Sequence, residues 1–159
     1  MTHTKIKNLL ASAISSVSSS VSDYVLNPGK DFSRNRKLPA DKLISFLIAE
    51  GSSTTKNELL DFFGMSGQSP TSSAFFQQRS KLKSEALKNV FDAFTGAVPA
   101  GTATFPGFRL IAADGSTVSY FSTDKYSRPE EYFTSPGKSF KGVYSIHINA
   151  FQDLDSHLY

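Results

Sequence analysis

Apolar side chains recur at every third or fourth position through the first two-thirds of the chain, which is the spacing of one face of an α-helix. The clearest such series consists of Ile6, Leu9, Leu10, Ala13, Ile14, Val17 and Val21. Four more helices are predicted over residues 38–50, 55–63, 71–82 and 84–95. The helix at 38–50 is apolar around most of its circumference, so we expect it at the centre of a small helical core. Thr55 and Glu58 have the spacing of a capping box at the start of the next helix.

After Gly107 the helical periodicity gives way to short apolar runs bounded by glycine, which are typical of strands. Residues 108–113 and 116–122 predict two strands, and Asp114-Gly115 between them is a hairpin-turn signal. A polar loop is expected over residues 126–142, and the alternation over 142–154 predicts a third strand.

The expected fold class is therefore α+β. A helical domain at residues 1–100 is followed by a linker rich in glycine and proline, and then by a sheet domain at 107–159. Three strands without a covering helix leave an open face and an exposed edge. We therefore expect the sheet domain to be incomplete.

Charge changes this picture because it is unevenly distributed. Residues 1–110 contain 13 Lys and Arg against 8 Asp and Glu, whereas residues 111–159 contain 4 against 6. A cationic surface attracts polyanions such as nucleic acids, although an ordinary solvated surface has a similar composition. The absence of cysteine excludes a disulfide framework and a thiolate zinc site. No apolar run reaches the roughly eighteen residues of a membrane span, and the expected location is cytoplasmic.

Two groups of polar residues are candidates for contact with DNA. The first lies on the second helix of a helix-turn-helix-like pair at 56–82 and comprises Gln77, Gln78, Arg79 and Lys81. These residue types read base edges or contact phosphates. The alternative is a helical hairpin that packs Phe75 and Phe76 inward and leaves a solvated polar face. The second group, on a predicted loop, comprises Arg34, Arg36 and Lys37.

Asp114 is the candidate for catalysis and metal binding. A carboxylate at the end of a buried strand suits Mg²⁺, and two-metal nucleases gather such carboxylates from separate elements. Local sequence alone favours the simpler interpretation, a hairpin turn at Asp-Gly. His3, His147 and His157 have no metal-ligand spacing, although alternation places His147 on the sheet face opposite Ile146 and Ile148.

Several of these segments, taken in order, resemble bacterial DDE transposases of the insertion-sequence-four type. The resemblance covers roughly residues 30–159. The similar segments are Arg34-Asn35-Arg36-Lys37-Leu38-Pro39 and residues 43–48, 57–63, 69–82, 109–116 and 147–154. The resemblance implies a helical DNA-binding region followed by the first three strands of a ribonuclease-H-like domain. In it Asp114 would be the first catalytic carboxylate.

Such an enzyme would use Mg²⁺ to cleave phosphodiesters at transposon ends and to transfer strands. The family's second carboxylate, in an Asp-Arg-Gly motif, and its third, a glutamate near a Tyr-and-Arg signature, do not occur here. The resemblance therefore implies a truncated transposase that binds double-stranded DNA but is inactive alone. Its expected partners are transposon ends and a second copy or the full-length transposase. The alternatives are a regulatory DNA-binding module without catalysis and a non-functional, unstable fragment.

Overall fold

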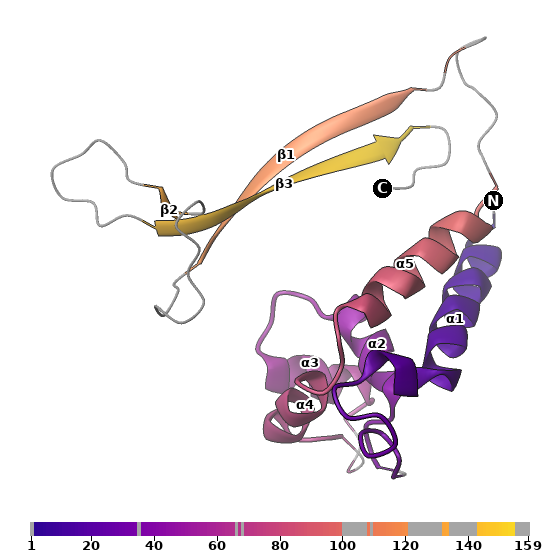
Figure 1. Cartoon of the computed structure of the whole chain (residues 1–159), viewed down its shortest axis with the longest axis vertical. Coiled ribbons are helices and arrows are strands. Elements are labelled where there is room, and N and C mark those ends of the chain that lie inside the picture. The colour runs from indigo at the N-terminus through magenta and orange to yellow at the C-terminus, as the bar shows by residue number, and fades with distance from the viewer. Residues whose placement is uncertain are drawn as a thin grey trace, which may run out of the picture. The chain divides into compact units, whose positions relative to one another are not determined.

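The chain divides into two compact units, Met1–Val98 and Pro99–Tyr159. The computed structural model describes residues 2–34, 36–65, 67, 69–99, 108, 110–120, 132–133 and 143–154. All helices of these residues lie in the first unit and all named strands in the second (Figure 1). The expectation of an α+β fold is confirmed.

The described residues of the helical unit form five α-helices in the regions predicted for them. They are α1 (His3–Ser19), α2 (Ala40–Ala49), α3 (Thr55–Phe62), α4 (Ser72–Arg79) and α5 (Glu85–Ala97), with a short 3₁₀ helix η1 (Val21–Tyr24) after α1. None of the helices in the described residues combines the length and apolar character needed to cross a membrane.

The ends of two helices differ from the prediction. α4 ends at Arg79 rather than Leu82, because Leu82 forms an isolated antiparallel bridge with Val25. The capping box predicted at Thr55 is wrong. Thr54 is the N-cap of α3 without a side-chain bond, and the carboxylate of Glu58 instead accepts the backbone N–H of Ser53 at 2.8 Å.

The helical unit has two apolar clusters, and α2 contributes side chains to both of them. The first joins α1, α2 and α5 through Ala13, Ile14, Val17, Ile44, Ala86 and Val90. The second joins α2 to α3, α4 and the preceding loop through Leu38, Leu43, Phe46, Leu59 and Phe75. α2 is thus the central helix, as its apolar circumference predicts.

The second unit contains a three-stranded antiparallel sheet with the strand order β1-β3-β2. Its strands are β1 (Ile111–Tyr120), β2 (Tyr132–Phe133) and β3 (Val143–Asp153). The third predicted strand is confirmed as β3. The hairpin turn predicted at Asp114-Gly115 is wrong, because β1 runs through both residues and pairs with β3 along its whole length. The short β2 lies inside the segment predicted to be a polar loop.

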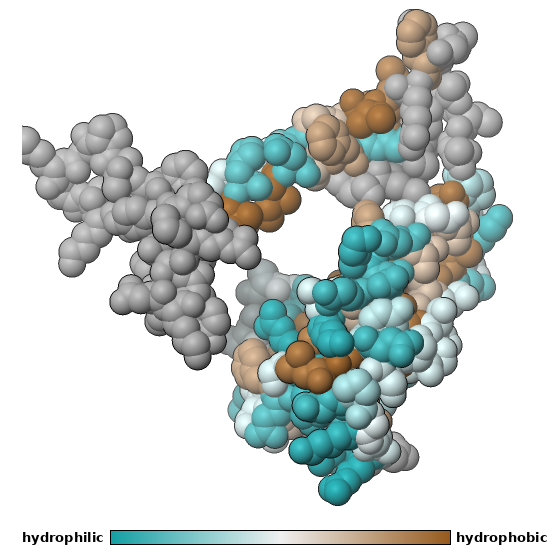
Figure 2. Space-filling model, in the orientation of Figure 1, coloured by the Kyte–Doolittle hydropathy of each residue, from teal (hydrophilic) through white to brown (hydrophobic). Residues whose placement is uncertain are grey.

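Apolar side chains lie at the surface of this sheet (Figure 2). Val118, Ile146 and Ile148 are 50%, 47% and 49% exposed, and register places them on one face. On the other face Ile111 and Phe151 are also exposed. Both faces of the described strands therefore carry exposed apolar side chains.

Candidate nucleic-acid interface

The basic loop before α2 and the helix α4 are far apart in sequence but line two adjoining depressions of the helical unit. The first, of about 560 Å³ and here called the loop depression, is formed by the loop from Asn27 to Arg36 with Gln78 and Lys81. The second, of about 780 Å³ and here called the helix depression, lies between Arg36-Lys37 and the N-terminal part of α4. Three residues line both depressions: Arg36, Leu38 and Gln78.

The depressions gather most of the DNA-contact residues predicted from the sequence. Those that line one or both are Arg34, Arg36, Lys37, Gln77, Gln78 and Lys81. Arg79 does not line either depression. It lies five positions after Ala74, which lines the helix depression. Five residues of an α-helix make one full turn and about 140° of the next, so the two side chains leave the helix in directions about 140° apart. Arg79 therefore points to a different side of α4.

Positive charge dominates both depressions. Among the described residues, five cations line them, namely Lys30, Arg34, Arg36, Lys37 and Lys81. The single described carboxylate in their lining is that of Asp31, whose Oδ2 accepts the backbone N–H of Asn27 at 3.0 Å and a hydrogen bond from the Asn27 side-chain amide at 3.1 Å. Lys88 and Asp92 form an ion pair on α5, and among the described residues none of the five cations that line the depressions has a carboxylate partner.

The basic loop is held at two points close to its cations. The side chain of Leu38 is 3% exposed and packs in the same apolar cluster as Phe75 of α4. The Nζ of Lys37 donates a hydrogen bond of 2.9 Å to the backbone oxygen of Gly67, in the connection between α3 and α4. The loop is thereby fixed to both helices.

The exposed face of α4 differs from both interpretations of the sequence. Phe75 is fully buried, but Phe76 is 50% exposed, so the two rings do not both pack inward. Both interpretations predict an exposed Gln78, but its side chain is buried, with 7% of its surface exposed. Its position three residues after Phe75 explains this, because residues three apart share one side of a helix. The α3–α4 connection, residues 63–71, also exceeds the three or four residues of a helix-turn-helix.

Asp114 lies on the sheet, exposed, as the fourth residue of β1 rather than at a strand end. Its Oδ1 accepts the backbone N–H of Gly115 at 2.9 Å, and its cross-strand partner is Ala150. Asp153 pairs with Ile111, an odd number of positions from Asp114 along β1. Because side chains alternate between faces along a strand, Asp153 and Asp114 point to opposite faces of the sheet.

The described residues contain no group of three His, Cys, Asp or Glu side chains that could hold a metal ion. Asp124, Glu130, Glu131 and Asp155 lie outside the described residues. Since two-metal chemistry needs several converging carboxylates, the donor set around Asp114 in the described strands does not fit the Mg²⁺ pair that the resemblance implies.

His147 takes part in a side-chain contact on the face opposite Asp114. Register places it beside Thr117, and the hydroxyl of Thr117 lies 3.2 Å from its Nδ1. Its neighbours along β3, Ile146 and Ile148, point to the opposite face of the sheet, as the alternation predicts. His3 is the first residue of α1, and His157 lies outside the described residues.

Sequence reasoning missed several residues that line the loop depression, among them Lys30, Asp31 and Leu38. Lys30 and Asp31 follow Asn27-Pro28-Gly29, which is a helix break in the sequence. The backbone N–H groups of Lys30 and Asp31 both donate to the oxygen of Asn27, at 3.2 and 3.0 Å. This tight turn was signalled by the Asn-Pro-Gly triplet, but the triplet does not reveal which helix the turn approaches.

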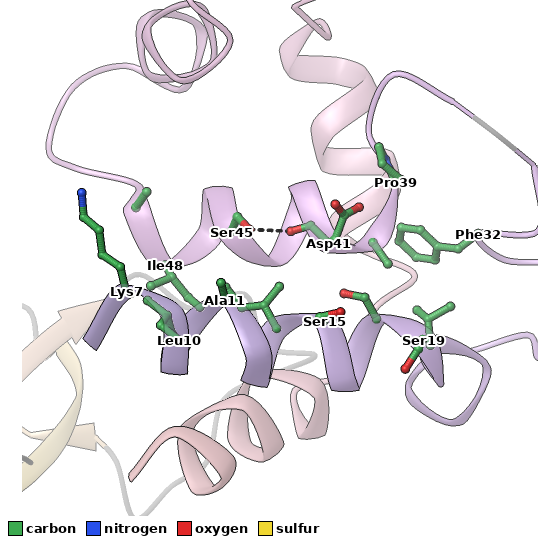
Figure 3. Close-up of a pocket in the computed structure, with 15 residues that line it drawn as sticks. Lys7, Leu10, Ala11, Ser15, Ser19, Phe32, Pro39, Asp41, Ser45 and Ile48 are labelled. Carbon is green, nitrogen blue, oxygen red and sulfur yellow. Dashed lines mark hydrogen bonds between the residues drawn. The ribbon is translucent and has the colours of Figure 1, made fainter. Parts of the chain in front are cut away.

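A further groove of about 770 Å³ lies between α1 and α2 (Figure 3). Small side chains such as Ala11, Ser15 and Ser45 line much of it. Its charged lining residues are Lys7 and Asp41, one of each sign. With no excess of cations, this groove does not suit a polyanion. No family model, curated protein or solved structure matches the chain.

Proposed function

We propose that the chain binds double-stranded DNA through its helical unit, with the loop and helix depressions as the contact surface. The observation that carries the proposal is the gathering of Arg34, Arg36 and Lys37 from one segment with Gln77, Gln78 and Lys81 from another. These residue types are those that contact phosphates or base edges, and together they line the two depressions. Cations without carboxylate partners are what a phosphate backbone requires, because each phosphate contact releases a condensed counterion.

The resemblance of the sequence motifs extends this proposal to a family. We propose that the chain is an N-terminal portion of a DDE transposase, whose sheet unit begins a ribonuclease-H-like domain with Asp114 as its first carboxylate. The DNA bound would then be a transposon end, and the partner a second copy or the full-length enzyme. Mg²⁺ would belong to the complete family member, where it supplies charge stabilisation at the reacting phosphodiester.

For this chain by itself we propose binding without cleavage. One exposed carboxylate on β1, with Asp153 on the opposite face, provides no second ligand for a metal pair. A DNA-binding regulator of the full-length transposase is the second candidate function, and the same observation favours it. The two candidates share the DNA-binding surface and differ in whether the complete enzyme is the partner.

DNA binding is tested with the full chain and a fluorescent duplex, by anisotropy at increasing salt. If each of the five lining cations neutralises one phosphate, the slope of log K against log salt reaches about −4.5. Affinity then falls roughly 500-fold between about 50 and 200 mM salt. The double variant Arg36→Gln/Lys37→Gln should make the slope less steep by about 2.

The matched control is Lys42→Gln/Lys56→Gln, which removes the same charge from exposed positions on α2 and α3 outside both depressions. Its slope should stay within experimental error of the unmodified chain. Equal effects of the two double variants would mean that net charge alone drives binding, and the proposed surface would be wrong. Nicking of supercoiled plasmid by the purified chain with Mg²⁺ would overturn the proposal of binding without cleavage.

A further inference from the structure

We infer that the junction of the two depressions seats one phosphate of the DNA backbone, with the buried amide of Gln78 as a fixed neutral donor to it. The inference rests on the proposed function and adds a specific subsite to it. Gln78, Arg36 and Leu38 are the three residues that line both depressions. Leu38 and Gln78 are 3% and 7% exposed, whereas Arg36 is exposed.

The hydrogen bond to Lys81 sets the orientation of the Gln78 amide. Lys81 Nζ lies 3.2 Å from Gln78 Oε1. An ammonium group only donates hydrogen bonds, so the oxygen of the amide must face Lys81 and the NH₂ group must face away from it. The hydrogen bond with Lys81 therefore determines which end of the Gln78 amide is the oxygen and which is the nitrogen.

The Nε2 group of Gln78 has no hydrogen-bond partner within the described residues. Among the described residues, the one side-chain polar atom that is both fully buried and without a partner is Oγ of Ser18. The unpaired Nε2 atom of Gln78 is therefore not fully buried. This amide nitrogen is accessible at the protein surface, on a side chain that lines both depressions. A donor that is held in a wall and left unpaired can complete its hydrogen bonds with an acceptor-only ligand.

The surroundings determine which acceptor suits the junction. Arg36 presents a planar set of donors that matches the oxygens of a phosphate, and Lys81 adds a point charge beside the amide. Asp31, the one lining carboxylate, has its Oδ2 occupied by two hydrogen bonds from Asn27. A phosphodiester oxygen accepts hydrogen bonds and carries charge, so it satisfies the amide and the cations together.

The test compares two charge-matched substitutions of an amide by a carboxylate in the full chain. Gln78→Glu replaces the N–H donors with a carboxylate oxygen at the junction, whereas Asn57→Asp adds the same charge at an exposed position of α3 outside both depressions. We expect Gln78→Glu to weaken binding to duplex DNA by about 10- to 100-fold, and Asn57→Asp by about 3-fold or less. Equal losses would overturn the inference.

Gln78→Met is the second variant, since it removes the donors without adding charge and suits a buried position. We expect a loss of about 5- to 10-fold that is the same at every salt concentration, because no cation is removed. If Gln78→Met binds DNA like the unmodified chain while Arg36→Gln/Lys37→Gln still lowers the salt slope, the phosphate subsite is wrong and the DNA-binding surface stands. If the unmodified chain does not bind duplex DNA, both proposals fail.

Inorganic phosphate tests whether the junction binds a free phosphate compound instead of a phosphate of the DNA backbone. Titration of the chain with phosphate, followed by calorimetry, should give binding no tighter than millimolar, because a single phosphate lacks the neighbouring contacts of a DNA backbone. Saturable binding of phosphate at micromolar concentration that is lost in Gln78→Met would assign the junction to a free phosphate compound. That outcome would overturn the assignment to the DNA backbone.

Discussion

Replacing Phe46 with alanine should destabilise the helical unit strongly, because this side chain joins three helices. It lies on α2, is 1% exposed, and its ring meets Phe62 of α3 and Phe75 of α4 edge to face, with ring centres 5.4 and 5.0 Å apart. Truncation of a buried phenylalanine to alanine costs about 3–5 kcal/mol, which includes roughly 0.5–1.5 kcal/mol for each edge-to-face pair. The total stability of a domain of this size is only about 5–15 kcal/mol.

Thermal unfolding of the full chain, followed by far-ultraviolet circular dichroism, measures this loss because the helices dominate the signal. At about 4–8 °C for each kcal/mol in a domain of this size, Phe46→Ala should lower Tm by roughly 12–40 °C. The control is Phe76→Ala, whose side chain is 50% exposed. It should cost about 1 kcal/mol or less. Similar shifts for the two variants would refute the assignment of Phe46 to the centre of the core.

Two further predictions concern helix capping and the sheet. Thr71→Ala should cost about 1 kcal/mol in urea unfolding, because Thr71 Oγ1 accepts the backbone N–H of Ala74 at 3.2 Å, whereas Thr54→Ala should cost little since Thr54 makes no such bond. Comparable losses would contradict this difference in capping. In Gly115→Ala the new Cβ would lie 3.2 Å from Cε1 and Nε2 of His147, so the ring must shift. An unchanged His147 ring signal in NMR spectra of that variant would contradict the strand register.

The existence of the helices follows from sequence, but some of their ends do not. Periodicity is a local property, and it placed α1 to α5 in the correct order. The end of α4 depends on contacts between distant segments. Leu26 N donates to the oxygen of Lys81 at 3.0 Å, and Lys83 N donates to the oxygen of Tyr24 at 2.8 Å. These hydrogen bonds hold residues 81–83 outside the helix, and no local sequence pattern predicts such bonds.

The interpretation of Asp114-Gly115 failed for a related reason. The dipeptide favours a two-residue turn, but the flanking residues on both sides can extend a single strand. Pairing with β3 continues without interruption from Ile111 to Tyr120 and outweighs the preference of the dipeptide. The partner strand is more than twenty residues downstream along the chain, beyond the reach of any local signal.

For the candidate interface, sequence reasoning identified suitable residue types but not their proximity. Arg36 and Gln78 are separated by two helices, and their meeting depends on the packing of α4 against α2 and the loop. The burial of Gln78 was within reach of the sequence, because Phe75 lies on the same side of the helix. The exclusion of Arg79 from both depressions follows from the same helical geometry once the direction of Ala74 is known.

The anchoring of Leu38 in the core has a consequence for the kinetics and thermodynamics of binding. Arg36 and Lys37 immediately precede this buried side chain, so the backbone that carries them is already ordered before DNA arrives. Segments that fold on binding lose conformational entropy at that moment, and this lowers their affinity. A pre-ordered loop avoids most of this loss. Association should therefore proceed as the docking of a rigid surface, with a rate set by electrostatic attraction and a small change in heat capacity.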